Sequence, residues 1–229
     1  KRSILFVGEA PGANEDQQGR QFIGVAGQLL RDAVRRFSVS LGECRVTNAL
    51  ICWPHTKRGK NRTPTHNEIE HCRPNLIKLV QEEQPEVIVL LGAVPVRSLI
   101  GWLWKEDTGG IRKWTGWQIP DQRLNAWVCP TYHPSFLNRT RGEEEGESQG
   151  HDGRERPIDP VLLGLFEGHL QAALALQGRP WKTLPDYSKR VVKCLNPSEA
   201  AYKLRELTKQ GRPLAFDFET DRLKPDHPE

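Results

Sequence analysis

Two kinds of segment alternate along the first 177 residues. Short apolar runs lie at residues 3–7, 46–51, 87–91 and 126–130, and helix-period segments lie at 26–37, 65–83, 93–103 and 159–177. Continuous apolar runs are typical of strands buried on both faces, and strand alternating with helix is typical of α/β proteins. We predict a three-layer α/β/α sandwich around a central four-stranded parallel sheet, with the functional loops at the carboxyl ends of its strands. Residues 109–120 are expected to form a small antiparallel excursion before the last strand.

The character of the chain changes after residue 178. Residues 179–211 combine prolines and mixed charge with an amphipathic segment that opens near Asn196 and ends at Gly211, a residue typical of helix ends. An apolar strand that carries Asp217 and Glu219 is expected to follow. We therefore divide the chain into a domain at 1–178, a linker with one helix at 179–211, and the start of a further domain at 212–229.

Net charge, the lengths of the apolar runs and the cysteine content limit the classes of partner and the location that we expect. The net charge of +4 favours an anionic partner only weakly, since 33 basic residues face 29 acidic ones. The chain has no apolar run long enough for a membrane span and no secretory leader, so we expect a cytoplasmic protein that binds no membrane. Five dispersed cysteines favour free thiols or metal ligands over disulfides. The lack of methionine suggests a missing upstream segment.

The loop after the first strand is rich in glycine, which is typical of anion-binding turns. It has neither the Gly-Lys-Ser/Thr ending of a P-loop nor the glycine spacing of a dinucleotide-binding turn. Glu9, Glu15 and Asp16 would repel a triphosphate in the absence of metal ions. The loop alone therefore does not predict a nucleotide site.

Four ordered motifs resemble the uracil-DNA glycosylase superfamily, in particular its family-4 type. They are Gly8-Glu9-Ala10-Pro11-Gly12 with residues 15–30 of the same loop, Thr47-Asn48, Cys52 with Asn61-Arg62-Thr63-Pro64, and His133-Pro134-Ser135. The resemblance covers residues 1 to about 177. It implies an enzyme, acting as a monomer, that hydrolyses the N-glycosidic bond of uracil in DNA without a cofactor in the chemistry.

The resemblance implies three residues that grip the base. Phe22 supplies the face on which an extruded uracil stacks, and the amide of Asn48 matches the O4 and N3–H of uracil. His133 donates to uracil O2 and stabilises the leaving anion. The alternatives are a core phenylalanine, a turn asparagine and a surface histidine.

The segment after His133 resembles the family's minor-groove loop. By that resemblance Ser135 contacts substrate, and either Phe136 or Leu137 fills the gap left by the flipped base. Arg139 and Arg141 are expected to contact phosphates.

Activation of water is the least determined step. Other glycosylase families place an aspartate at the position of Ala10, whereas family-4 enzymes use other polar groups, so Glu15 and Asn61 are the candidates. Glu9 is expected to bind the substrate through its backbone or to hold the loop, and Ala10 and Gly12 are expected to line the substrate site. Either acid can instead cap a turn or helix.

Family-4 enzymes also hold a four-iron cluster, and two of its cysteines match Cys52 and Cys72. The other pair would precede Lys1, so the resemblance implies a cluster in a longer protein and not in this chain alone. Ordinary buried thiols are the alternative for Cys52 and Cys72.

The end of the chain resembles the first motif of DEDD 3′–5′ exonucleases in family-A DNA polymerases, with Asp217 and Glu219 as metal ligands only in a complete domain. The resemblance implies a glycosylase domain covalently attached to a phage-like polymerase. The alternative function is a weak or inactive uracil-binding module that guides the polymerase, since the spacing between Cys52 and Cys72 is four residues longer than expected.

Overall fold

The computed structural model describes residues 3–104, 108–139, 158–179, 192–194, 196–209 and 211, without the side chains of residues 138 and 139. The chain divides into two compact units, Lys1–Thr183 and Leu184–Glu229. The predicted strand at 212–229, with Asp217 and Glu219, lies outside the described residues, as does Arg141.

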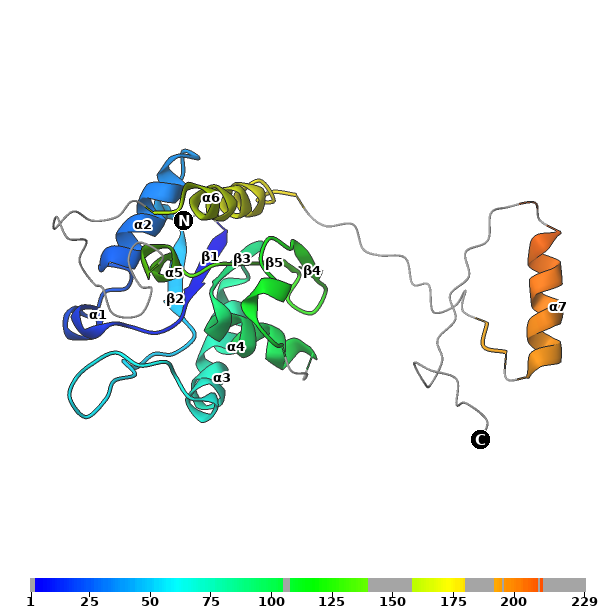
Figure 1. Cartoon of the computed structure of the whole chain (residues 1–229), viewed down its shortest axis with the longest axis horizontal. Coiled ribbons are helices and arrows are strands. Elements are labelled where there is room, and N and C mark those ends of the chain that lie inside the picture. Colours follow the sequence, from blue (N-terminus) through cyan, green and yellow to red (C-terminus); the bar gives the residue numbers. More distant parts are fainter. Residues whose placement is uncertain are drawn as a thin grey trace, which may run out of the picture. The chain divides into compact units, whose positions relative to one another are not determined.

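The first unit is built on a five-stranded sheet in the order β2-β1-β3-β5-β4 (Figure 1). Its strands are β1 (Ile4–Gly8), β2 (Arg45–Asn48), β3 (Val87–Leu91), β4 (Ile119–Asp121) and β5 (Ala126–Thr131). The first three strands and β5 are parallel, whereas β4 pairs antiparallel with β5. The predicted parallel four-stranded sheet is thus confirmed, and the excursion adds a short fifth strand at its edge.

Helices cover both faces of this sheet. The helices of the first unit are α1 (Ala13–Gln18), α2 (Val25–Arg35), α3 (His66–Glu83), α4 (Ala93–Trp104), α5 (Pro134–Arg139) and α6 (Pro160–Leu174), with short 3-10 turns at Leu41–Glu43 and Ile111–Lys113. The α/β/α sandwich is confirmed. The sequence pattern missed α1 and α5, since six-residue helices are too short to show an apolar period.

The alternation of side chains along the strands divides the core into two layers. Ile4, Phe6 and Val89 face a cluster completed by α2 and α6, whereas Leu5 and Ile88 face a cluster completed by α3 and α4. Successive side chains of a strand point to opposite faces, which is why one apolar run serves both layers. The loops at the carboxyl edge therefore extend from a sheet that is packed on both faces.

The described part of the second unit contains α7 (Pro197–Thr208). The side chain of Asn196 caps this helix by accepting the N–H of Glu199 at 2.8 Å. The start near Asn196 agrees with the sequence pattern. Among the described residues of the chain, no helix has the length and apolar character needed to cross a membrane.

Candidate functional site

The first loop and the end of β2 are joined at the carboxyl edge of the sheet. Gly8 pairs with Asn48 in the parallel register. The ladder continues beyond the strands, because Ala49 donates to the carbonyl of Gly8 at 2.9 Å and Leu50 to that of Glu9 at 3.0 Å. Glu9 is thus held through its backbone, and the two loops leave the sheet from one fixed point.

Asn48 and Phe22 meet above Gly8. A Cβ at Gly8 would lie 2.4 Å from Oδ1 of Asn48 and 2.7 Å from Cζ of Phe22, so only glycine leaves room for both side chains. Both residues are nearly buried, at 7% and 6% exposure. A polar amide beside an aromatic ring in a nearly dry position is the arrangement that base recognition requires.

The backbone of Phe22 is held in an unusual conformation. Its φ of 56° is in the left-handed region, which costs a non-glycine residue about 1–3 kcal/mol. Gly27 makes room for it, since a Cβ there would lie 1.9 Å from the carbonyl oxygen of Phe22. The same oxygen accepts from the guanidinium of Arg31 at 3.2 Å. These contacts hold the backbone of Phe22 in its left-handed conformation and thereby fix the position of its ring.

Glu15 closes the first loop on itself. Its carboxylate accepts the N–H of Gly12 at 2.7 Å, that of Ile23 at 3.1 Å and that of Gly24 at 3.5 Å. Both carboxylate oxygens therefore tie the start of α1 to the segment that follows Phe22. This geometry favours the capping alternative for Glu15.

Two further predicted residues of the first loop, Gly12 and Ala10, have structural positions in it. Gly12 is the N-cap of α1. Ala10 is partly buried against a small cluster that contains Leu50 and Ile69. The methyl group of Ala10 therefore packs where a carboxylate would face apolar neighbours.

His133 follows β5 and is oriented by the start of α5. Its Nδ1 lies 2.6 Å from Oγ of Ser135 and accepts the backbone N–H of Ser135 at 3.1 Å. Because Nδ1 accepts, a neutral imidazole carries its proton on Nε2. Gly92, with a φ of 96°, lets the ring approach, since a Cβ there would lie 2.9 Å from that of His133. Ser135 thus orients the histidine.

The structure distinguishes between the two predicted wedge residues. Leu137 is fully buried in the core, so its prediction as a wedge is corrected. Phe136 is 37% exposed and stacks on Tyr132 with 5.6 Å between ring centroids. One turn of α5 directs the two side chains to different sides, which leaves Phe136 as the candidate. The side chain of Arg139 lies outside the described residues.

The loop after β2 folds back on itself before α3. Asn61 lies in this loop, and its Oδ1 accepts the indole N–H of Trp53 at 2.6 Å. The isolated bridge between His55 and Asn61 holds this residue in the turn. The structure therefore brings Phe22 and Asn48 together, while Asn61 lies in a separate turn.

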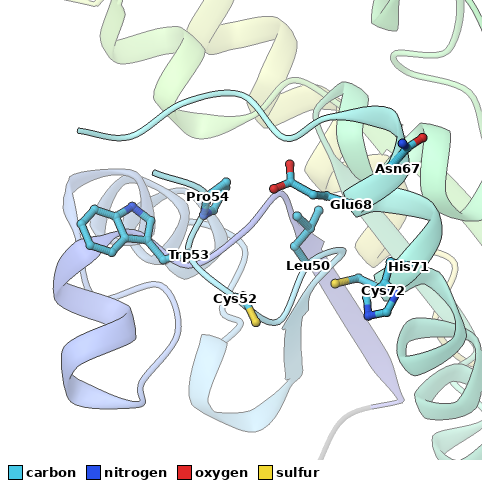
Figure 2. Close-up of a pocket in the computed structure, with 8 residues that line it drawn as sticks. All are labelled: Leu50, Cys52, Trp53, Pro54, Asn67, Glu68, His71 and Cys72. Atoms are coloured by element: carbon cyan, nitrogen blue, oxygen red, sulfur yellow. The ribbon is translucent and has the colours of Figure 1, made fainter. Parts of the chain in front are cut away.

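A pocket of about 430 Å³ lies between this loop and α3 (Figure 2). Cys52 and Cys72 both line it, and Figure 2 shows the sulfur of Cys72 turned toward the segment that carries Cys52. Cys52 is exposed and Cys72 buried. Two thiols supply half of a four-thiolate set, and the described residues hold no group of three or more histidine, cysteine or acidic side chains suited to a metal.

The other cysteines of the first unit do not complete this set. Cys44 is buried and donates to the carbonyl of Ser40 at 3.6 Å. Cys129 is buried in β5, and burial raises the pKa of its thiol to about 12. Cys129 is therefore protonated and inert at neutral pH.

Two groups of hydrogen-bonded polar side chains were not predicted from the sequence. Glu68 pairs with Arg62, with one bond of 2.8 Å, and accepts from the backbone and hydroxyl of Thr65 at 2.8 and 2.9 Å. The hydrogen bonds from Arg62 and Thr65 lower the pKa of Glu68 to about 2. The Thr65-x-x-Glu68 spacing is a capping-box signal that could have revealed it.

The second missed arrangement supports the end of β5. His169 of α6 lies with its Nδ1 3.1 Å from the hydroxyl of Thr131, and its ring faces that of Tyr132 at 6.1 Å. Burial lowers the pKa of His169. No sequence signal joins residues 38 positions apart.

The loops after β1, β2 and β5 thus place a buried aromatic ring, a buried amide and an oriented histidine at the carboxyl end of a parallel α/β sheet. The family model of the uracil DNA glycosylase superfamily matches residues 1–151. The chain belongs to this superfamily, as the sequence motifs predicted.

Similar proteins are type-4 uracil-DNA glycosylases. That of Pyrobaculum aerophilum is 37% identical over 167 residues, covering 70% of this chain and 83% of the relative. That of Thermotoga maritima is 36% identical over 62% of this chain and 69% of the relative. That of Archaeoglobus fulgidus is 34% identical over 65% and 73%.

Proposed function

We propose that this chain is a type-4-like uracil-DNA glycosylase that releases uracil by hydrolysing its N-glycosidic bond. The observation that carries the proposal is the convergence of Phe22 and Asn48 above Gly8, at a strand edge that also ends in His133. Family membership supports the same reaction. The proposed substrate is uracil in DNA, and the base must be extruded before Phe22 and Asn48 can contact it.

The proposed base pocket is formed around Phe22 and Asn48, so one ring and one amide contact the base. Uracil stacks on Phe22, an interaction worth roughly 1–3 kcal/mol per base. The amide of Asn48 donates to O4 and accepts from N3–H, and cytosine presents the opposite pattern at these atoms. An amide fixed by burial cannot easily turn to serve both bases, so Asn48 provides the discrimination.

The bond breaks with its electron pair moving to the base. As the C1′–N1 bond lengthens, negative charge develops on uracil O2, and Nε2–H of His133 donates to it. A water molecule then adds to C1′ and loses its proton, while the released uracil anion takes up a proton from solvent. The protein contributes charge stabilisation and orientation, and the step requires no cofactor.

A second candidate function is uracil binding without turnover. The engagement of Glu15 by backbone N–H groups and of Asn61 by Trp53 favours it, because both predicted water-activating groups have other partners. In the excision mechanism Glu15 holds the loop, and water is polarised by the developing positive charge at C1′. The two functions differ in product and not in affinity.

An excision assay distinguishes them. A uracil-containing oligonucleotide is incubated with excess protein and then cleaved at abasic sites with alkali, beside His133→Ala and Asn48→Ala. Strand breaks that slow in both variants support the glycosylase. Binding that is specific for uracil and gives no breaks supports the binding module, and a folded sample that does neither refutes both.

The finer predictions extend this proposal. Cys52 and Cys72 would supply two thiolates to an iron–sulfur cluster, whose role when bound is structural. Iron content and visible absorption, lost in Cys52→Ser with Cys72→Ser, would test this. The attached exonuclease and polymerase part, with Asp217 and Glu219, the monomeric state and the cytoplasmic location stay predictions.

A further inference from the structure

The loop after β2 contains a turn with an unusual concentration of positive charge. We call residues 53–62 the basic hairpin. Its tip carries Lys57, Arg58 and Lys60, which are all exposed, and none of the three pairs with a carboxylate among the described residues. Exposed cations without acidic neighbours create a positive potential that attracts an anionic partner.

The hairpin has a defined conformation. Thr56 donates to the carbonyl of Lys60 at 2.8 Å, and Lys60 donates back to the hydroxyl of Thr56 at 3.2 Å. Gly59, with a φ of 71°, makes the reversal and donates to the carbonyl of Thr56 at 2.9 Å. The tip cations are therefore presented from a closed turn.

Two contacts fix the base of the hairpin. Trp53 donates to Asn61 at 2.6 Å across it and packs against the ring of His55, with 4.6 Å between centroids. Arg62 leaves the hairpin to bind Glu68 through both of its terminal nitrogens. Arg62 is thus used internally, whereas the three tip cations are not.

The hairpin is attached directly to the wall of the base pocket. It begins five residues after Asn48, past the two ladder bonds that join Ala49 and Leu50 to the first loop. It ends four residues before α3, and Figure 1 shows the loop leaving the same end of the sheet as α1. Cations anchored here lie on the side of the molecule that receives the substrate.

We propose that the basic hairpin binds backbone phosphates of the DNA beside the flipped nucleotide, through Lys57, Arg58 and Lys60. This inference rests on the proposed DNA substrate but not on turnover. Neutralising a phosphate releases a counterion, so each contact contributes about 0.9 to the slope of log affinity against log salt for duplex and about 0.7 for single strands. Three contacts predict a slope of roughly 2–3 from the hairpin.

The test is the salt dependence of binding to DNA that contains no uracil. Anisotropy of a labelled duplex and of a labelled single strand is measured between 50 and 200 mM salt. The variant K57Q/R58Q/K60Q should have a slope smaller by about 2–3, so that wild type loses roughly 40-fold more affinity over this range on duplex. Lys57→Arg with Lys60→Arg should keep the wild-type slope, because charge and not shape makes the contact.

A matched control removes three cations outside the hairpin. Arg35 ends α2, Lys78 lies in the second half of α3 and Arg123 precedes β5, and all three are exposed. Arg35 and Lys78 form exposed ion pairs within their helices, which contribute little to stability, and Arg123 lies 3.8 Å from the buried carboxylate of Asp121. R35Q/K78Q/R123Q has the same net charge as the hairpin variant and should keep the wild-type slope. Equal slopes in the two triple variants would overturn the proposal. If the hairpin triple fails to fold, Arg58→Gln alone should still lower the slope by about one.

Excision measured in parallel separates this proposal from the proposed function. The hairpin variant should keep the wild-type single-turnover rate at saturating DNA, since its residues do not line the base pocket. If wild type never excises uracil but the hairpin variant has a reduced salt slope, the proposed glycosylase function is refuted and the role of the hairpin is supported. If wild type excises uracil and the hairpin variant has an unchanged slope, the role of the hairpin is refuted and the glycosylase function is supported.

Discussion

The loops that follow β1 and β2 leave the same edge of the sheet but direct their side chains to different places. The first loop closes around the carboxylate of Glu15 and buries Phe22, whereas the basic hairpin exposes three cations to solvent. Burial and hydrogen bonds hold the first loop in place, whereas charge acts from the second over roughly a Debye length of 10 Å. Changes in the first should therefore alter the rate, and changes in the second should alter salt-dependent affinity.

The largest effect is expected at His133, which Ser135 orients at the carboxyl end of β5. His133→Ala removes the donor to the developing oxyanion and should lower the single-turnover rate by about 10²–10³. His66→Ala, at an exposed position of α3, serves as the control. A His133→Ala rate within threefold of wild type would remove this residue from the mechanism.

Gly8→Ala tests how precisely the pocket wall is packed. The added methyl would meet Asn48 at 2.4 Å and Phe22 at 2.7 Å, so one of the two must move. A displacement of about 1 Å can cost 10²-fold in rate, and we expect a loss of that order in a single-turnover assay.

Gly110→Ala is the matched control, because a Cβ there meets nothing within 4 Å. Its rate should equal that of wild type. Similar rates for the two variants would mean that the Gly8 contact does not position the pocket.

Glu15→Gln separates a loop clamp from a general base. The amide cannot accept on both sides, so at least one backbone N–H loses its partner at a cost of about 1–3 kcal/mol, and the melting temperature should fall. The rate of the folded fraction, measured well below the melting temperature, should fall less than tenfold. A loss above 100-fold with unchanged melting would identify Glu15 as the base.

The smallest effect is expected at the anchor of the basic hairpin. Arg62→Ala should weaken DNA binding severalfold at pH 7 without changing the excision rate at saturation.

Glu68 has a pKa lowered to about 2, so its contribution to folding stability is complete above its ordinary pKa of 4.5 and is lost as the pH falls toward 2. Thermal melts should therefore show wild type losing its stability advantage over Glu68→Gln between pH 4.5 and 2. A difference in melting temperature that stays constant over this range would contradict the assignment.

The sequence predicted what local patterns encode. The sheet and its main helices follow from apolar runs and helical periods, and the family follows from the ordered motifs around Gly8, Asn48 and His133. The inward turn of Leu137 could not be predicted, since α5 has only six residues. The clamp of Glu15 on Ile23 depends on a chain reversal eight residues away.

The aim of Phe22 could not be predicted for a related reason. Its left-handed backbone is compatible with the fold only because Gly27 lies against it, and nothing in a linear pattern joins the two. The cations of the basic hairpin stand in the sequence but were not predicted as a site, and the closed form of the hairpin and its anchor on Glu68 follow from tertiary contacts. Residue types can be read from sequence, whereas the contacts that aim them depend on tertiary packing.

Release of free uracil by the purified chain is the most direct test of the central claim. A uracil-containing oligonucleotide is incubated with excess protein, and the base is quantified by chromatography beside Asn48→Ala. The proposed base pocket predicts one equivalent of uracil per oligonucleotide from wild type and release at least about tenfold slower from the variant, because Asn48 reads the base. No release from a folded wild-type sample, or equal release from both proteins, would contradict it.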